Sequence, residues 1–433
     1  MIPVTALAHK ETGFLPKLKA AMQYLRKKPG FCRSDYPNYQ FPIPNYPKFM
    51  FRKTPLAWLQ VTREKTRLAV AIAGIAFADI LIFVQLGFQD ALFDSAVKPH
   101  ESLQTDLVLI NPQFETFAAV KQFNRERIYQ AQGVAGVKSV SSLYIGMGQW
   151  RNPTNRTTRG ILIFGIDPGS TTFNLPDVNQ KLAKIQMFNH VLFDQASRPE
   201  YGEIANIFNK ESTLETELNK RNILVGGVFT LGTSFVADGN VIASDSTFMN
   251  LFPDRKPDQI DVGLIQLKPG ADILKVQSML KAILPDDVKV LTLAEFSEIE
   301  KAYWGNATPI GFIFGFGTII GFIVGLIIVY QILYSDVSDH LAEYATLKAM
   351  GYSDRYLVGV LVQEALLLAV LGFLPGIVLA NGLYSLAQSA TLLPIAMTAN
   401  RATTVLGLTI VMCTGSGALA LRKLRSADPA DIF

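Results

Sequence analysis

Two carboxylates inside long apolar runs are the residues of this chain best placed to do chemistry. Asp79 is the one ionisable residue in the run 68–87, and Glu364 lies in the run 357–379. A carboxylate is costly in hydrocarbon, so both are candidates for a functional site. Each also has a structural explanation. Asp79 could be held by hydrogen bonds to a neighbouring helix, while Glu364 could pair with Lys348 or Arg355 or reach headgroup water.

The motifs of common enzymes and nucleotide-binding sites are missing from the sequence. It contains no G-x-x-x-x-G-K-[ST], no G-x-S-x-G and no H-E-x-x-H. The four histidines lie far apart, and the two cysteines, Cys32 and Cys413, cannot build a metal site. We therefore expect no catalytic residue, cofactor site or metal site in this chain, and any ATP to be bound by a partner subunit.

The charged segment Ser335–Gly351 separates two apolar runs. Its apolar residues recur at helical spacing on one side, and they are Leu341, Tyr344 and Leu347. Glu343 lies on another side, and Gly351 is placed to end the helix. A short amphipathic helix between two membrane spans suits the docking of a soluble partner. The alternative is an ordinary solvated loop.

Composition indicates a protein that is partly embedded in a membrane. Hydrophobic residues make up 49% of the chain and charged residues 18%, and the mean hydropathy is +0.25. These values are high for a soluble protein and low for membrane helices alone, which predicts a few spans and one sizeable water-soluble domain. The net charge of +4 is small and dispersed, so a nucleic-acid partner is not expected.

Four apolar runs are each long enough to cross about 30 Å of hydrocarbon. They are 68–87, 311–334, 357–379 and 402–421. The segments around them are an interfacial amphipathic helix at 50–67, a coupling helix and loop at 335–356, a connector at 380–401 and a tail at 422–433. Lys and Arg flank the first and fourth runs, whereas residues 380–400 contain neither. This asymmetry predicts that both termini are cytoplasmic.

The long stretch 88–304 contains no membrane span. Strand-like and helix-like runs alternate there, and strand-like runs include 106–110, 140–150, 159–167 and 229–237. We expect an α+β domain with two lobes, one near 140–250 and one formed by about 100–140 with 255–300. Residues 270–296 read as helix, turn and strand, as in a βαβ unit, and 197–222 as a surface helix and loops.

Residues 1–49 fit neither part of this plan. They are rich in proline and aromatic residues and lack the apolar core of a signal peptide. We expect either a weakly ordered extension or a start codon assigned upstream of Met50.

Residues 343–351, EYATLKAMG, resemble the coupling-helix motif of MacB/FtsX-type ABC transporter permeases. That motif reads roughly Glu-apolar-Gly-apolar-apolar-Arg-Ala-apolar-Gly. Within the family the likeness is greatest to DevC, the permease of cyanobacterial DevBCA exporters, and it covers about Met50 to Phe433. Ala345 and Lys348 stand where the family usually has Gly and Arg.

The resemblance implies an α-helical inner-membrane protein with four transmembrane helices. A large periplasmic α+β domain with Porter-like and Sabre-like subdomains would be inserted between the first and second helices. The implied partners are a second copy of the chain, membrane lipid, a DevA-like ATP-binding subunit, a DevB-like adaptor and a TolC-like outer-membrane channel. The implied coupling residues are Leu341, Glu343, Tyr344, Leu347, Lys348 and Gly351.

The implied function is mechanotransmission, in which ATP hydrolysis in the partner drives periplasmic efflux of an envelope lipid or glycolipid. Two alternatives share the same four spans. One is an FtsX-like transducer that activates a cell-wall hydrolase, and the other is a lipoprotein-releasing permease. The large domain at 88–304 favours export over the transducer.

Overall fold

The structure is a computed structural model, and it describes residues 58, 63–211, 213–350 and 353–426. The N-terminal extension 1–49, Gly351 and the end of the tail lie outside the described residues.

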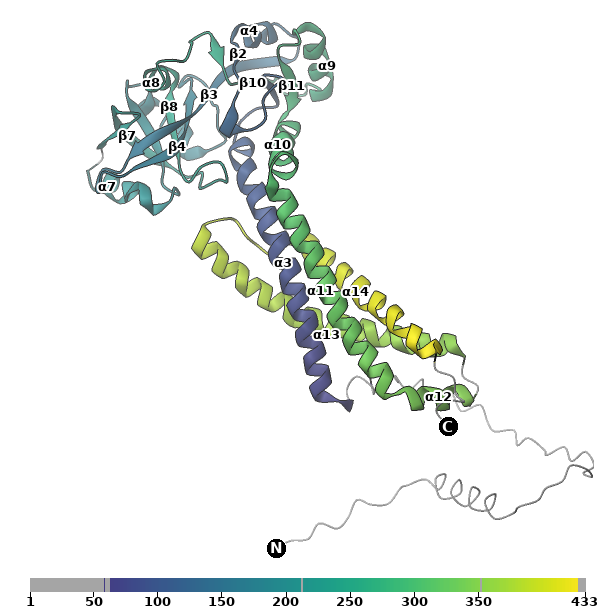
Figure 1. Ribbon diagram of the computed structural model, residues 1–433. Coiled ribbons are helices and arrows are strands. Elements are labelled where there is room, and N and C mark those ends of the chain that lie inside the picture. The colour runs from purple at the N-terminus through teal and green to yellow at the C-terminus, as the bar shows by residue number, and fades with distance from the viewer. Residues whose placement is uncertain (1–57, 59–62, 212, 351–352, 427–433) are drawn as a thin grey trace, which may run out of the picture. The chain divides into compact units, whose positions relative to one another are not determined.

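Four long helices run through the apolar segments (Figure 1). They are α3 (Lys65–Glu101), α11 (Pro309–Asp339), α13 (Asp354–Thr391) and α14 (Ala399–Ser426). Within the described residues, these four helices are the ones long and apolar enough to cross a membrane. Four membrane-capable helices are thus confirmed.

Close helix packing depends on small residues at the contacts. At Gly325 of α11, an added Cβ would lie 2.2 Å from Sδ of Met412 in α14 and 2.7 Å from Cβ of Ala78 in α3. Only glycine lets these three helices approach so closely. Gly325 therefore contributes to helix packing, whereas an added Cβ at Gly315 of the same run would meet no described atom within 4 Å.

Two helices continue well beyond the apolar runs. α3 extends past Gly87 to Glu101, and α13 extends past Leu379 to Thr391. Hydropathy marks where a sequence stops being apolar, whereas a helix ends where its backbone hydrogen bonds end. The extra turns of α3 carry the chain to the sheet.

All the described strands lie in chain order between α3 and α11. They are β1 (Leu107–Ile110), β2 (Phe123–Asn124), β3 (Val137–Arg151), β4 (Thr158–Ile166), β5 (His190–Asp194), β6 (Leu214–Leu218), β7 (Arg221–Phe229), β8 (Asn240–Ser244), β9 (Gln259–Ile260), β10 (Val262–Leu267) and β11 (Lys289–Thr292). Nine of them form one mixed sheet in the order β11-β1-β10-β3-β4-β8-β5-β7-β6, and β2 pairs with β9.

The two expected lobes are parts of this single sheet. Strands β11, β1 and β10 come from the first and last segments of the domain, and β4 to β8 come from the middle. The 15-residue strand β3 pairs with β10 along one half and with β4 along the other. Its length is what joins the lobes. The expected β-helix-β arrangement is present, because β10 and β11 both pair with β1 and are joined through helix α9 (Ile273–Ile283).

Short helices cover both faces of the sheet. They are α4 (Glu126–Gln132), α5 (Pro176–Asn179), α6 (Leu182–Ile185), α7 (Ile204–Glu211), α8 (Asp245–Leu251), α9 (Ile273–Ile283) and α10 (Leu293–Ala302), with short helical turns η1 (Phe117–Ala119), η2 (Pro199–Tyr201) and η3 (Tyr303–Ala307). Leu107 and Leu109 of β1 face one core, and Val108 and Ile110 face the other. This alternation follows from the two-residue period of a strand.

Two local predictions about this domain are wrong. Residues 229–237 read as a strand, but only Phe229 belongs to one, at the end of β7. Residues 214–218, LETEL, read as part of a helix and loop, but they form strand β6, which pairs with β7 and, at Leu218, with β3. The two leucines of β6, Leu214 and Leu218, are four positions apart, so their spacing fits one face of a helix as well as one face of a strand.

Candidate coupling site

Arg67, in the first turn of α3, lies among carboxylates from two parts of the chain. Its Nη1 atom is 3.5 Å from Oδ1 of Asp336 and 3.4 Å from Oε2 of Glu64. Its Nη2 atom donates a hydrogen bond to Asp339. Since Asp336 and Asp339 form the last turn of α11, Arg67 joins the start of α3 to the end of α11. This part of the bundle leads into helix α12 (Leu341–Ala349) and is called the α12 end below.

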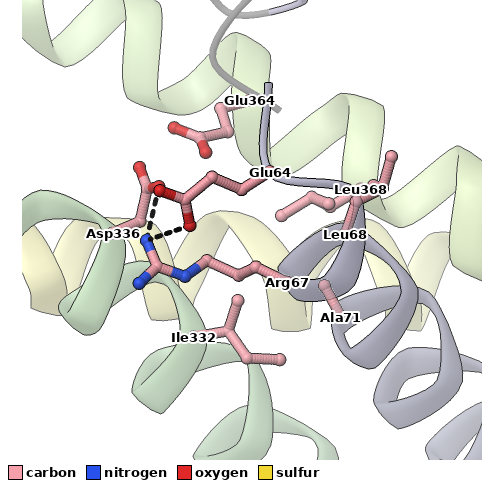
Figure 2. A pocket seen from close by; sticks show the side chains of 8 residues that line it. All are labelled: Glu64, Arg67, Leu68, Ala71, Ile332, Asp336, Glu364 and Leu368. Carbon is pink, nitrogen blue, oxygen red and sulfur yellow. Dashed lines mark hydrogen bonds and ion pairs between the residues drawn. The ribbon is translucent and has the colours of Figure 1, made fainter. Parts of the chain in front are cut away.

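Glu364 of α13 faces the same cluster (Figure 2). It lines a small pocket of about 20 Å³ together with Glu64, Arg67 and Asp336. Glu364 is 3% exposed, which excludes the reading in which it reaches headgroup water. Among the described side chains, the cation that lines this pocket is Arg67. Arg355, which the sequence suggested as a partner, is exposed and does not line the pocket, and the side chain of Lys348 lies outside the description.

Helix α12 (Leu341–Ala349) follows directly after α11 (Figure 1). The segment expected to couple to a partner is therefore helical, with Gly351 beyond the described residues. Glu343 is exposed, and its Oε1 atom is 3.5 Å from Nη1 of Arg63. The two side chains are 56% and 69% exposed, so this pair contributes little stability.

The predicted apolar stripe of α12 is only partly on the surface. Leu341 is half-buried, whereas Tyr344 is 3% exposed and therefore packs within this chain. The side chains of Leu347 and Lys348 lie outside the description. The exposed positions near them are Ala342, Glu343, Thr346 and Met350. A docking partner would meet this exposed side.

Asp79 is fully buried between three helices. Thr409 of α14 donates a 2.6 Å hydrogen bond to Oδ1 of Asp79. An added Cβ at Gly376 of α13 would lie 3.1 Å from Cβ of Asp79. Glu364 precedes Gly376 by twelve residues of α13, about 18 Å along the helix. The structure therefore does not bring the two intramembrane acids together.

The sequence analysis missed an ion pair at the other end of the bundle. Arg401 of α14 is 6% exposed and donates to Oδ2 of Asp90 in α3 at 3.0 and 2.7 Å. Its guanidinium also donates to the backbone oxygen of Ala396 at 2.8 Å and lies over the ring of Tyr384. The only signal in the sequence is that both charges lie just beyond apolar runs.

A second missed cluster surrounds Glu300, where the helices meet the sheet. Its carboxylate accepts from the hydroxyl of Thr116 at 2.7 Å, the amide of Phe117 at 3.1 Å and the indole of Trp304 at 2.8 Å. Nε2 of His100, near the end of α3, lies 3.4 Å away, and the His100 ring stacks on Phe117. Glu300 and His100 are both fully buried. One carboxylate thus connects α3, the chain leading into α11, and the sheet domain.

Residues 306–429, which contain α11 to α14, match the family model described as FtsX-like permease C-terminal. This part of the chain is similar to the C-terminal domain of FtsX-like permeases. The match supports the MacB/FtsX family, whose members are permease components of ABC transporters and work with an ATP-binding subunit.

Solved structures of two extracytoplasmic domains are similar to the sheet domain at low identity. The periplasmic region of MacB from Actinobacillus actinomycetemcomitans is 13% identical, with a TM-score of 0.32, over 45% of this chain and 92% of that one. The extracellular domain of the ABC-type transporter YknZ from Gram-positive bacteria is 16% identical, with a TM-score of 0.29, over 43% and 99%. Both likenesses are too distant to transfer a function. No curated protein matches the chain.

Proposed function

We propose that this chain is the permease subunit of an ABC exporter that works by mechanotransmission. The match of residues 306–429 to an FtsX-like permease carries the proposal. Helix α12 would dock a separate ATP-binding subunit, and α3 and α11 would carry the motion to the sheet domain. The chain itself would not hydrolyse ATP.

The remaining parts of the proposal follow from the resemblance to DevC. Two copies of the chain would pair in the inner membrane, with termini and α12 in the cytoplasm and the sheet domain in the periplasm. A DevB-like adaptor and a TolC-like channel would receive an envelope lipid or glycolipid. An FtsX-like transducer remains the alternative, and isolation of the periplasmic partner separates an adaptor from a hydrolase activator.

Contacts within the described chain support a mechanical role for α3 and α11. At the α12 end, Arg67 of α3 contacts Asp336 and Asp339 of α11. At the sheet end, His100 of α3 lies against Glu300, which precedes α11. Helix α3 thus contacts α11 at the α12 end and the segment that precedes α11 at the sheet end. A displacement of α12 would therefore move α3 and α11 together.

The test is co-purification of the ATP-binding subunit. Because Tyr344 is buried, its removal would also disturb α12 itself, so exposed positions make better probes. Ala342→Arg with Thr346→Arg should release the partner by placing two charges in the interface. Glu298→Arg, at an exposed position of α10, is the control and should retain it. Full retention by the double variant, with normal export, would show that α12 is not the docking site.

A further inference from the structure

The two helices that lead to the sheet domain, α3 and α11, join it in different ways (Figure 1). Helix α3 runs without a break to Glu101, and Val97 and His100 near its end are buried. The sheet domain begins immediately afterwards, where the Gln104 amide donates a 2.8 Å hydrogen bond to the backbone oxygen of Thr172. Helix α3 is therefore fixed to the domain by buried side chains and by backbone hydrogen bonds.

The connection between α10 and α11 is interrupted. After α10, the turn η3 is π-helical, and Thr308 is extended, with φ −115° and ψ 158°. Pro309 follows and has no amide hydrogen, so the helical hydrogen bonds of α10 do not continue through it into α11. All of residues 303–320 are described, and none of them is buried. A π-helical turn beside a backbone break, outside any buried core, is a place where a helix can bend.

Trp304 marks the end of the part that is held by the sheet domain. Its indole donates a 2.8 Å hydrogen bond to Glu300, and its ring meets that of Phe235 edge-on, with 4.5 Å between the centroids. Beyond Trp304, the hydroxyl of Thr308 bridges the break. It donates to the backbone oxygen of Trp304 at 2.6 Å and accepts from the Ile310 amide at 3.3 Å. Bending would therefore begin after Trp304.

Two glycines bring η3 and α11 together at the break. An added Cβ at Gly311 would lie 2.0 Å from the backbone oxygen of Gly305, so this contact requires glycine at position 311. An added Cβ at Gly305 would lie 3.6 Å from the ring of Phe93 in α3, which is ordinary van der Waals contact. Since neither glycine has a side chain, the two backbones touch there without interlocking side chains.

We propose that residues 305–308 are a hinge at which α11 turns relative to the sheet domain, while α3 moves with the domain. Because α3 is fixed to the domain, the sheet-end half of α11 can move relative to α3 only if the connection between α10 and α11 deforms. The hinge provides that freedom, while Arg67 keeps the two helices joined at the α12 end.

The role of the hinge in export rests on the proposed function. A displacement of α12 would reach the sheet domain through α3, and turning at residues 305–308 would let α11 follow without distorting the sheet. The hinge itself is a property of this chain and can be measured without an ATP-binding subunit.

The test measures distances across the hinge by double electron–electron resonance on the purified full chain in detergent. One spin label at Glu298→Cys on α10 is combined with a second at Ile323→Cys on α11 or, as the matched control, at Phe77→Cys on α3. All three parent side chains are exposed. The two second positions lie at a similar level of the bundle, because Gly325 of α11 packs against Ala78 of α3.

The distance distribution of the α11 pair should be at least about twice as wide as that of the α3 pair. Cys32→Ser with Cys413→Ala removes the native thiols, and a wild-type Tm of this background shows that the replacements leave the fold intact. Equal widths for the two pairs would show that α11 and α3 are joined to the sheet domain with the same rigidity, and would overturn the proposal.

Gly311→Ala tests the position of the hinge, because the added Cβ would press on the backbone oxygen of Gly305. It should shift the mean distance of the α11 pair by at least about 2 Å and leave that of the α3 pair unchanged. Gly315→Ala is the control and should shift neither, since its added Cβ meets no described atom within 4 Å. A shift of both distances by Gly311→Ala, or of neither, would show that α11 does not turn at this segment. Failed co-purification of an ATP-binding subunit would count against the proposed function alone.

Discussion

Arg401 and Asp90 join the start of α14 to α3 through two hydrogen bonds to one carboxylate oxygen. The arginine is 6% exposed, whereas the Asp90 side chain is 50% exposed. The Asp90 carboxylate thus pairs with the guanidinium of Arg401, whose positive charge is buried. Breaking such a pair costs more than its net contribution, because one charge stays buried and unpaired.

Asp90→Asn should therefore lower the free energy of unfolding by about 1–3 kcal/mol. Arg401→Lys should lower it as well, because an ammonium cannot reproduce the guanidinium fork or its contact with the Tyr384 ring. Denaturant unfolding in detergent measures both. Asp94→Asn, at an exposed position one turn further along α3, is the control and should be nearly silent.

Gly87 of α3 provides the space for Tyr384 of α13. An added Cβ there would lie 2.4 Å from the Tyr384 hydroxyl oxygen. Gly87→Ala should destabilise the bundle by about 1–3 kcal/mol. A second change, Tyr384→Phe, should not restore that loss, because the ring carbons Cζ and Cε1 would still lie 2.5 and 2.6 Å from the added Cβ, and the hydrogen bond from the Tyr384 hydroxyl to the backbone oxygen of Phe83 would also be lost. At Gly382, an added Cβ meets no described atom within 4 Å, so Gly382→Ala should leave the Tm unchanged or slightly higher.

Asp79→Asn should preserve both assembly and export if the residue serves to pack helices. The amide oxygen can still accept the hydrogen bond from Thr409, and the shape against Gly376 is unchanged. Thr409→Val removes the donor and should destabilise more than Asp79→Asn does. Loss of export by Asp79→Asn, with the complex intact, would instead show that the carboxylate charge is needed.

Glu300→Gln should loosen the junction between the helices and the sheet. The amide replaces one of two accepting oxygens, so at least one of the donors on Thr116, Phe117 and Trp304 loses its acceptor. An orphaned buried donor costs about 1–3 kcal/mol. Hydrogen exchange at the Phe117 amide should become faster. Glu298→Gln, whose parent side chain is 73% exposed on the same helix, should leave this rate unchanged.

Glu295 makes the start of α10 sensitive to acid. Thr292 and Glu295 form a capping box, in which the Thr292 amide donates to the Glu295 carboxylate at 2.7 Å. This bond lowers the pKa of Glu295 below its ordinary value of 4.5, helped by a hydrogen bond from Gln277. A lowered pKa gives stability that is present above pH 4.5 and lost as the pH falls through the folded value.

The comparison with Glu295→Gln isolates this effect. Hydrogen exchange in the first turn of α10 should be slower in the wild type than in the variant near neutral pH. That difference should disappear as the pH falls below 4.5. A difference that stays constant across this window would show that the charge of Glu295 does not stabilise the cap.

The sequence by itself determined the four membrane-capable helices, the helical segment around Glu343 and most of the strands. These features are local. Crossing a membrane requires about 20 consecutive apolar residues, and a buried strand leaves a run of β-branched residues that short windows reveal. The failures were also local: the two leucines of LETEL in β6 have a spacing that a helix shares, and the polar turns of α3 beyond Gly87 look no different from the domain that follows.

Only the tertiary structure decided which charges meet. Arg67 contacts Asp339 across 272 positions, Arg401 contacts Asp90 across 311, and Thr409 contacts Asp79 across 330. Such contacts depend on how each helix is rotated about its axis and how far it is shifted along its neighbours. Hydropathy predicts that a segment is long and apolar enough to cross a membrane. Because hydropathy is almost uniform around these helices, it does not predict their rotation or their shift along one another. Side-chain packing determines both.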